Sequence, residues 1–364
     1  MFRSIRPLVS PFRPRGVLIA TVLAGAGLLS ACGQSAAPEP ATPASEPGAA
    51  APSGAIDPAV DDLPITDPPV PAKATGNPLA GAKLWVDPES LAALRANAIR
   101  AQEPANAAIL DKIAQQPQAL WLGEWNSNIY RTVQHVVGKA KAEGAMPVFI
   151  AYNLPHRDCG QHSAGGLKGK DDYRQWIRKI HAGIGQDAAV VVLEPDALGL
   201  LDKCLSNEQQ EERLFLLRDA VRVLRQNPKT VVYLDAGHSR WAPADVMAER
   251  LKKAGIDEAH GFALNTSNYG FTEENIEYGK KVSELVGGAP FVIDTSRNGA
   301  GPAPNNEWCN PPGRKIGKPP TTETGDPLVH AFLWLKRPGE SDGECGGGPR
   351  AGVFWQERAI EMAQ

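Results

Sequence analysis

The chain lacks the features that define several large classes of proteins. Its 364 residues hold 38 Lys and Arg against 41 Asp and Glu, so it lacks the basic excess typical of nucleic-acid-binding proteins. No Gly-x-Gly-x-x-Gly sequence follows an early strand and no Walker-type loop occurs, so nucleotide binding has no support. The apolar run at residues 17–29 is too short to cross a bilayer as a helix, which takes about 20 residues.

The N-terminus has the layout of a bacterial export signal. Four arginines within residues 3–15 precede the apolar run, which ends in Leu29-Ser30-Ala31-Cys32. These last residues resemble a lipobox, in which the cysteine is lipidated and becomes the new N-terminus. A soluble signal peptide with an incidental cysteine is the alternative. We expect residues 1–31 to be a lipoprotein signal peptide and Cys32 to carry the lipid anchor.

Residues 32–76 are expected to be a tether between the anchor and a folded domain. The segment is rich in Ala and Pro, so it cannot bury a core and repeated proline keeps it extended. No acidic residue directly follows Cys32, which favours the outer membrane or cell surface of a bacterium. A single domain is then expected over residues 77–364.

The four other cysteines all lie in this domain, and an even number in an exported chain favours disulfides. Four cysteines allow three pairings. Metal binding is the weaker interpretation, because no two are close enough to form a Cys-x-x-Cys clamp, and we expect no metal site. The four are Cys159, Cys204, Cys309 and Cys345.

From residue 77 onward, short apolar segments alternate with segments of helical periodicity. Repeated strand–helix units predict parallel strands with crossover helices, and seven or eight units fit a TIM-like (β/α) barrel. An open doubly wound sheet is the alternative. The expected strands are 83–86, 119–123, 147–153, 189–195, 231–237, 262–268, 290–296 and 330–336. The expected helices are 128–144, 171–185, 207–226, 244–255 and 271–288.

Carboxylates follow several of the expected strands. Because parallel strands end at the same edge of a barrel, these side chains should meet there. Crowded carboxylates cannot all ionise easily, so one keeps its proton to higher pH and can act as a general acid. A helix cap or a loop hydrogen bond is the alternative for any single one of them. They are Asp158, Asp196, Asp235 and Asp294.

Tryptophans occur close to the same strand ends. Flat aromatic faces with polar side chains between them suit sugar rings, although core packing is the alternative for each ring taken alone. The four are Trp121, Trp125, Trp241 and Trp308.

The chain resembles glycoside hydrolase family 6, the cellulases of the endoglucanase and cellobiohydrolase type, over nearly all of residues 77–364. The resemblance is carried, in order, by YNLPHRDCG, VVVLEPDALG, VVYLDAGHSRW, ALNTSNY, FVIDTSRNG, NEWCNPPGR and WLKRPGESDGEC. It implies a distorted β/α barrel as the single catalytic domain, and an inverting attack on β-1,4-glucan. It also implies that Cys159 pairs with Cys204, and Cys309 with Cys345.

The resemblance implies a role for individual side chains. Asp196 would be the general acid, and Asp158 would raise the pKa of Asp196 and help to relay a proton from the attacking water. Asp294 would act on the opposite side of the scissile bond, while Glu194 is expected to be structural. Ser163 would hold the water. The expected substrate-binding residues are Asp235, Tyr152, Trp121, His238, Asn265, Trp308, Lys336 and Glu340.

The short spans between the paired cysteines favour an open cleft and therefore an endo-acting enzyme on cellulose or related β-glucans. An exo-acting cellobiohydrolase, a non-catalytic glucan-binding lipoprotein and a metal-dependent barrel hydrolase are the alternatives. We expect no cofactor, no nucleic-acid partner and a monomer. The expected partners are a β-1,4-glucan or cello-oligosaccharides and, through the lipid, a membrane.

Overall fold

The computed structural model describes Val60 and residues 63–364. The predicted signal peptide, Cys32 and most of the predicted tether lie outside these residues. Among the described helices, none is both long and apolar enough to cross a membrane.

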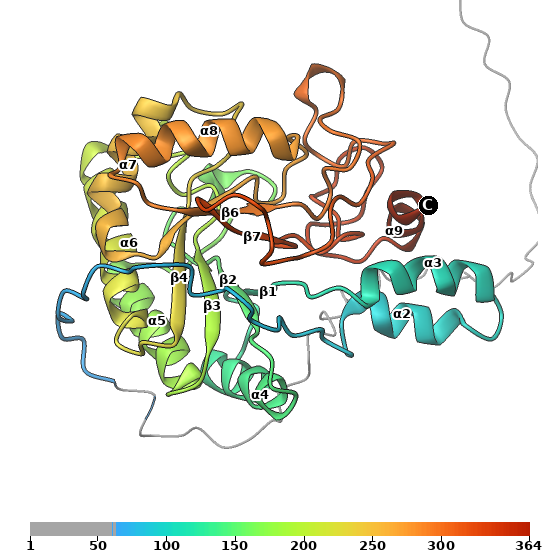
Figure 1. The fold of residues 1–364 in the computed structure, drawn as a ribbon, viewed down its shortest axis with the longest axis horizontal. Coiled ribbons are helices and arrows are strands. Elements are labelled where there is room, and N and C mark those ends of the chain that lie inside the picture. The colour runs from blue at the N-terminus through green and yellow to red at the C-terminus, as the bar shows by residue number, and fades with distance from the viewer. Residues whose placement is uncertain (1–59, 61–62) are drawn as a thin grey trace, which may run out of the picture. The chain divides into compact units, whose positions relative to one another are not determined.

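A parallel sheet of seven strands, in the order β1 to β7 along the chain, forms the centre of the described part (Figure 1). Six of the strands are buried along their whole length, because helices cover one face and the interior of the curled sheet covers the other. The strands are β1 (Leu120–Leu122), β2 (Val148–Ala151), β3 (Ala189–Leu193), β4 (Thr230–Asp235), β5 (Gly261–Leu264), β6 (Phe291–Asp294) and β7 (Val329–Leu333).

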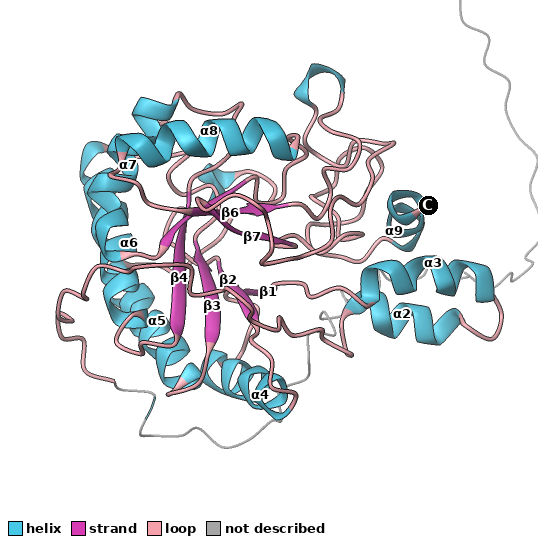
Figure 2. Ribbon diagram, in the orientation of Figure 1, coloured by secondary structure: helices cyan, strands magenta, loops and turns pink. Residues whose placement is uncertain are grey.

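Each of the first five crossovers contains one helix, and these helices pack on the outside of the sheet (Figure 2). All five coincide with the helices expected from the sequence. They are α4 (Ile129–Ala142), α5 (Lys170–Ile184), α6 (Asn207–Leu224), α7 (Ala244–Ala254) and α8 (Thr272–Leu285). The short 3-10 turns are η1 (Asp158–Gly160), η2 (Ile256–Glu258) and η3 (Pro304–Asn306).

Three further helices, which the sequence did not predict, form a small group beside the sheet. These are α2 (Leu91–Ile99), α3 (Pro104–Ala114) and α9 (Gln356–Ala363). They share an apolar cluster of their own that includes Leu110, Ile113 and Trp334. Lys112 of α3 donates to the Ala363 carbonyl at 2.8 Å, which ties the C-terminal helix to this group.

The sheet curls without closing. β1 and β7 do not pair as strands in the described chain, although Ala119 N–H donates to the Trp334 carbonyl at 2.9 Å. The fold is therefore a curled half-barrel, which confirms the predicted distorted β/α barrel with parallel strands. The segment expected as a strand at 83–86 forms only a single bridge, between Leu84 and Met146, where it meets the chain entering β2.

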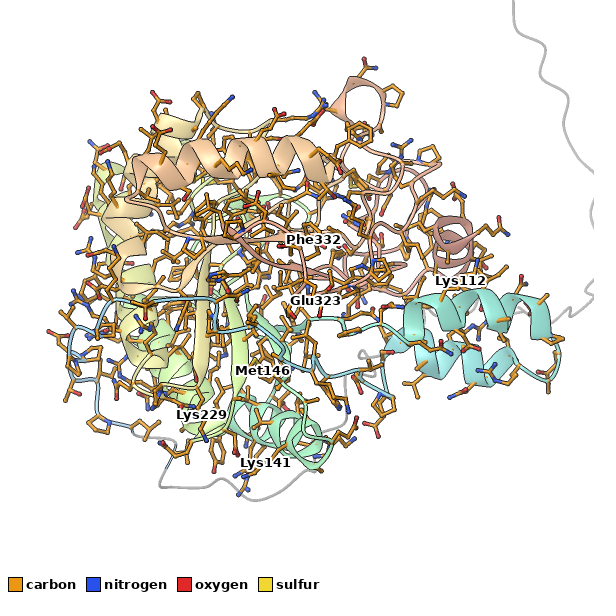
Figure 3. The ribbon with its side chains drawn as sticks, viewed as in Figure 1. Lys112, Lys141, Met146, Lys229, Glu323 and Phe332 are labelled. Atoms are coloured by element: carbon orange, nitrogen blue, oxygen red, sulfur yellow. A yellow bond between two sulfur atoms is a disulfide. The ribbon has the colours of Figure 1, made fainter. Side chains whose placement is uncertain are left out.

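Successive side chains along each strand point to opposite faces of the sheet, so the core has two layers. In β3, Val190 and Val192 point into the half-barrel, whereas Val191 and Leu193 pack against the helices. The amino ends of the strands lie at the edge marked by Met146 and Lys229, toward the bottom of Figure 3. The carboxyl ends, and the residues of interest, lie at the opposite edge.

Both disulfides pair as the family resemblance implied. Cys159 is bonded to Cys204, with their Cα atoms 5.6 Å apart, and Cys309 to Cys345, with 6.1 Å between Cα atoms. Each closes a loop at the carboxyl edge of the sheet. The first joins the chain after β2 to the chain after β3.

Replacing both Cys159 and Cys204 by serine should lower the free energy of unfolding by about 3–4 kcal/mol, because the unfolded chain regains the freedom of a loop of tens of residues. Urea denaturation under non-reducing conditions measures this. A change below about 1 kcal/mol would show that the bridge does not constrain the unfolded state.

Candidate active site

Asp196 lies at the centre of the carboxyl edge. It follows β3, and its own N–H donates to Asp235 Oδ1 at 3.2 Å, so the ends of β3 and β4 are tied together. The Tyr152 hydroxyl, which comes from the end of β2, donates to Asp196 Oδ2 at 3.3 Å. Residues at the ends of three neighbouring strands thus meet at Asp196, Tyr152 at its carboxyl group and Asp235 at its main chain.

The environment of Asp196 favours its neutral form. Burial is the main cause that raises its pKa to about 8, and the nearby charges of Asp235 and Asp158 add to it. The Tyr152 hydrogen bond and the Lys336 charge act in the opposite direction but are outweighed. A carboxylic acid that holds its proton at neutral pH can donate it to a leaving group.

Asp158 lies on the loop after β2, as expected. Its Oδ2 accepts the Ser163 N–H at 2.8 Å, and burial raises its pKa. Arg157 holds the same loop by donating to the Ser163 carbonyl at 2.8 Å and by pairing with Glu124 at 2.6 Å. The main chain of Ser163, rather than the hydroxyl expected to hold a water, therefore makes the contact with Asp158.

A glycine allows the loop after β2 to pack closely against the end of that strand. Gly166 has φ of +91°, and a Cβ there would lie 1.9 Å from the Leu154 carbonyl oxygen. Any side chain at this position would push the loop, and Asp158 with it, away from β2.

Asp235 is only 2% exposed, and its oxygens are engaged by the protein. Thr266 donates to Oδ2 at 2.7 Å, and the N–H groups of Gly237 and Asp196 donate to Oδ1 at 3.0 and 3.2 Å. Burial raises the pKa of Asp235 to about 7. Asp235 thus holds the main chain at Asp196, and its predicted contact with the substrate stays a prediction.

Asp294 is placed differently from the prediction that it acts on the sugar or the water. Its side chain is buried, and four main-chain N–H groups donate to its two oxygens at 2.9–3.2 Å. Two of these donors belong to Leu335 and Lys336, so the carboxylate joins the ends of β6 and β7. Asp294 thus anchors the sheet edge, and burial raises its pKa. Its action on the sugar or the water stays a prediction.

Asn265 is also an internal brace. It has no exposed surface, and its Nδ2 donates to the Asp294 carbonyl at 2.8 Å. Its Oδ1 accepts the Gly270 N–H at 3.0 Å. The side chain predicted to line a subsite is thus used to position the chain after β5.

The aromatic side chains form two groups close to the strand ends. Trp121 meets the Tyr152 ring edge-on at 5.1 Å between centroids, and Lys336 Nζ lies 5.5 Å from the Trp121 ring centre. His238 packs near Trp241 at 5.5 Å, and burial lowers the pKa of His238 to about 4. The predicted contacts of Trp121 and His238 with the substrate stay predictions.

Lys336 and Glu340 form a buried charged pair, with Nζ and Oε2 3.7 Å apart, and burial lowers the pKa of Lys336. Trp308 is 45% exposed on the loop after β6, where its ring meets His162 at 5.8 Å. His162 thus joins the loop after β2 to the loop of the second disulfide. An open tryptophan face at such a place is suited to a sugar ring.

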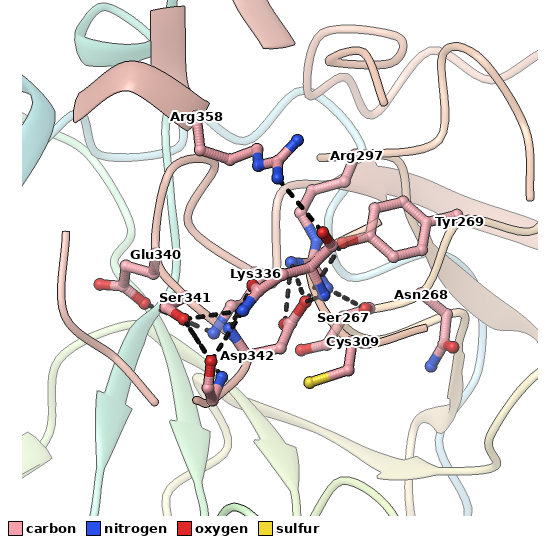
Figure 4. A network of polar contacts seen from close by, with 12 residues as sticks. Ser267, Asn268, Tyr269, Arg297, Cys309, Lys336, Glu340, Ser341, Asp342 and Arg358 are labelled. Carbon is pink, nitrogen blue, oxygen red and sulfur yellow. Dashed lines mark hydrogen bonds and ion pairs between the residues drawn. The ribbon is translucent and has the colours of Figure 1, made fainter. Parts of the chain in front are cut away.

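Sequence reasoning missed Asp342. Its two oxygens receive Arg297 Nη1 at 2.9 and 3.0 Å, and Oδ2 also accepts the Tyr269 hydroxyl at 3.2 Å (Figure 4). Asn310 N–H donates to the same oxygen at 3.0 Å, so the group joins the chain after β6 to the chain after β7. The signal was present in the segment Glu340-Ser341-Asp342, two residues beyond a predicted site residue.

One group has the spacing of a metal site. Ligand atoms of His162, Cys309 and Cys345 lie within 4.8 Å of one another. Both sulfurs belong to the disulfide, so they are not thiolates and cannot coordinate an ion as thiolates do.

A carboxylic acid with a raised pKa, beside other carboxyl groups at the carboxyl edge of a parallel half-barrel, is an arrangement that suits acid-catalysed cleavage of a glycosidic bond. The chain belongs to the glycosyl hydrolases family 6, whose family model matches residues 79–364.

Individual relatives agree with this assignment. Endoglucanase A of Cellulomonas fimi is 45% identical over 71% of this chain, although the match spans only 56% of that protein. Endoglucanase 1 of Streptomyces halstedii is 45% identical over 76% of this chain and 87% of that protein. The solved endoglucanase Cel6 of Mycobacterium tuberculosis, in complex with methyl-cellobiosyl-4-deoxy-4-thio-β-D-cellobioside, is 48% identical with a TM-score of 0.75, covering 79% of this chain and 98% of that one.

Asp196→Asn should make the protein more stable relative to the wild type as the pH rises. In the folded wild type Asp196 keeps its proton to about pH 8, whereas in the unfolded chain it loses it near pH 3.8. Between these values the unfolded state binds fewer protons, so the wild type loses stability with rising pH and the variant lacks this loss. Chemical denaturation at pH 5 and pH 8 measures the difference, and an equal gap at both values would contradict the proposed protonation.

Proposed function

We propose that this protein is an inverting endo-β-1,4-glucanase that acts on cellulose or related β-glucans. The observation that carries the proposal is the half-buried Asp196 carboxyl, with its pKa raised to about 8 and the Tyr152 hydroxyl 3.3 Å away. Family membership and the endoglucanase relatives supply the substrate class. The cello-oligosaccharide analogue held by the Mycobacterium tuberculosis structure supports the same class.

In this reaction Asp196 protonates the glycosidic oxygen while a water attacks the anomeric carbon from the opposite face. Tyr152, from the end of β2, presses on the sugar ring at the cleavage site and favours its distortion. Asp158 takes up the proton released by the water, through intervening water. Asp342 with Arg297 and Lys336 supplies the charged wall on the side of β7.

Endo action is favoured over exo action by the short loops and by the relatives. Only 45 and 36 positions separate the bonded cysteines, so neither loop has room for a long roof over the cleft. The two bacterial relatives with 45% identity are named endoglucanases. An open cleft admits an internal segment of a chain.

The proposal is tested with soluble cello-oligosaccharides, following the anomeric protons of the products by NMR. Inversion of a β-linkage gives the α-anomer first. Carboxymethylcellulose viscosity should fall quickly if cleavage is internal. Release of cellobiose alone with little fall in viscosity would instead identify an exo-acting enzyme, and inertness toward all β-glucans would leave a glucan-binding protein.

Asp196→Asn should lower kcat on cello-oligosaccharides by roughly 10²–10⁴-fold, since an amide cannot donate the acid proton. Aryl cellobiosides with a strongly acidic phenol need no protonation, so their hydrolysis should fall far less. In the wild type, activity should decline as the pH rises past about 8, where Asp196 loses its proton. Equal losses on both kinds of substrate would remove Asp196 from the role of acid.

We also propose that the protein is exported and anchored by a lipid on Cys32 at the outer membrane or cell surface, with residues 1–31 removed. The sequence Leu29-Ser30-Ala31-Cys32 after an apolar run supports this. Cys32→Ala should move the protein from the membrane fraction to the soluble fraction and abolish labelling by a radioactive fatty acid. Unchanged fractionation would favour an unlipidated export signal.

A further inference from the structure

Glu194 is a buried carboxyl group that the proposed reaction does not use. It directly follows β3, is 1% exposed, and precedes Asp196 by two positions. Its side chain reaches across to the end of β2, where Oε1 and Oε2 accept the Asn153 N–H at 3.1 and 3.0 Å. Oε2 also accepts the Leu154 N–H at 3.2 Å. The chain is therefore held immediately after Tyr152.

The backbone around Glu194 is kinked for this contact. Glu194 has φ of +53° and Asp196 has φ of +70°, in the left-handed region that side chains rarely adopt. Such conformations persist where the surrounding structure over-determines them, and they gather at functional sites. At Glu194, the hydrogen bonds that its side chain accepts from the Asn153 and Leu154 N–H groups hold the backbone in this left-handed conformation.

The Asn153 side chain does not help to hold the end of β2. It has no exposed surface, and within the described residues neither its Nδ2 nor its Oδ1 has a hydrogen-bond partner. The end of β2 is instead held through its main chain. Besides Glu194, Leu167 N–H donates to the Asn153 carbonyl at 3.0 Å and Arg157 Nη1 donates to the Tyr152 carbonyl at 2.8 Å.

The groups that face Glu194 come from each neighbouring element. Tyr173 of α5, Arg157 and Tyr152 interact with it electrostatically, and burial raises the pKa of Glu194 to about 7. Arg213 of α6 also faces it and donates to carbonyls on both strand exits: Pro155 at 3.1 Å, His156 at 2.9 Å and Ala197 at 3.2 Å. Glu194 and Arg213 thus brace the same two exits from opposite sides.

We propose that Glu194 is a positioning residue. It lies two residues before Asp196 and binds the main chain directly after Tyr152, so it sets the distance between the Tyr152 hydroxyl and the Asp196 carboxyl. This inference rests on the proposed function. Glu194 touches neither the sugar nor the attacking water. It acts through Tyr152, whose hydrogen bond is one of the influences that lower the pKa of Asp196.

The test is a double-mutant cycle of Glu194→Gln and Tyr152→Phe on cello-oligosaccharides. Glutamine replaces one of the two acceptor oxygens by an NH₂ group, which cannot accept the Asn153 N–H, and it removes the negative charge of the carboxylate. Glu194→Gln should lower kcat by roughly 10- to 100-fold with little change in KM, the loss expected when a reacting group is misplaced. Because Glu194→Gln acts through Tyr152, adding it to Tyr152→Phe should lower kcat by about twofold at most.

The pH profile gives a second readout. Loss of the Tyr152 hydrogen bond should move the alkaline limb of kcat/KM to higher pH in Tyr152→Phe. The same shift should appear in Glu194→Gln, and the double variant should show no further shift. If Glu194 only stabilised the fold, the pH of the alkaline limb would be unchanged in Glu194→Gln.

Asp219→Asn is the matched control. Asp219 is a buried carboxylate on the outer helix α6, paired with Arg174 at 2.9 Å and Arg178 at 3.0 Å. Its replacement should lower stability, leave the alkaline limb unchanged and combine additively with Tyr152→Phe. If Glu194→Gln fails to fold, Glu194→Asp, which keeps the charge but shortens the reach, replaces it in the same cycle.

Two outcomes would overturn the inference: additive losses in the cycle, or an alkaline limb that Glu194→Gln does not move. Either would reduce Glu194 to a fold-stabilising residue like Asp219. A wild-type protein without hydrolytic activity would instead remove the proposed function itself, so the two failures can be told apart.

Discussion

The desolvation of Asp196 is the constraint on which the site depends. β3 is covered by helices on one side and by the half-barrel interior on the other, so a carboxyl at its exit has little water. Charge is costly there, and the neighbouring carboxyls Asp235 and Asp158 raise the cost further. The sheet thus keeps a proton on this residue near neutral pH, which is the state that a glycosidic oxygen requires.

The same chemical group does different work at each strand end. Asp294 is filled by four main-chain donors and joins β6 to β7, while Asp235 and Glu194 hold the backbone on either side of the acid. Asp196 accepts a hydrogen bond from Tyr152, and Asp158 accepts one from the Ser163 N–H. Of the carboxyl groups that the structure describes at this edge, these two receive the fewest donors and are therefore the ones left to exchange protons.

Much of the fold could be predicted because its signals are local. Apolar runs and 3.6-residue periodicity indicated the parallel strands and the five crossover helices α4 to α8, and the motifs around them indicated the family and both disulfides. The segment 83–86 was predicted as a strand but forms only one bridge, from Leu84 to Met146. Strand formation depends on a neighbouring strand to pair with, which the local sequence does not specify. The helices α2, α3 and α9 were missed because they pack mainly on one another.

By itself the sequence determined that Asp158, Asp196, Asp235 and Asp294 follow strands that end at the carboxyl edge, since strand order and polarity follow from the repeating pattern. The tertiary structure alone decided what each of them does there. Asp294 ends a strand and was predicted, whereas Asp342 lies beyond β7 and was missed; main-chain amides donate to the first and Arg297 pairs with the second. Hydrogen-bond donors from distant strands and loops set the state of a carboxyl group, and such donors meet it only after the chain has folded.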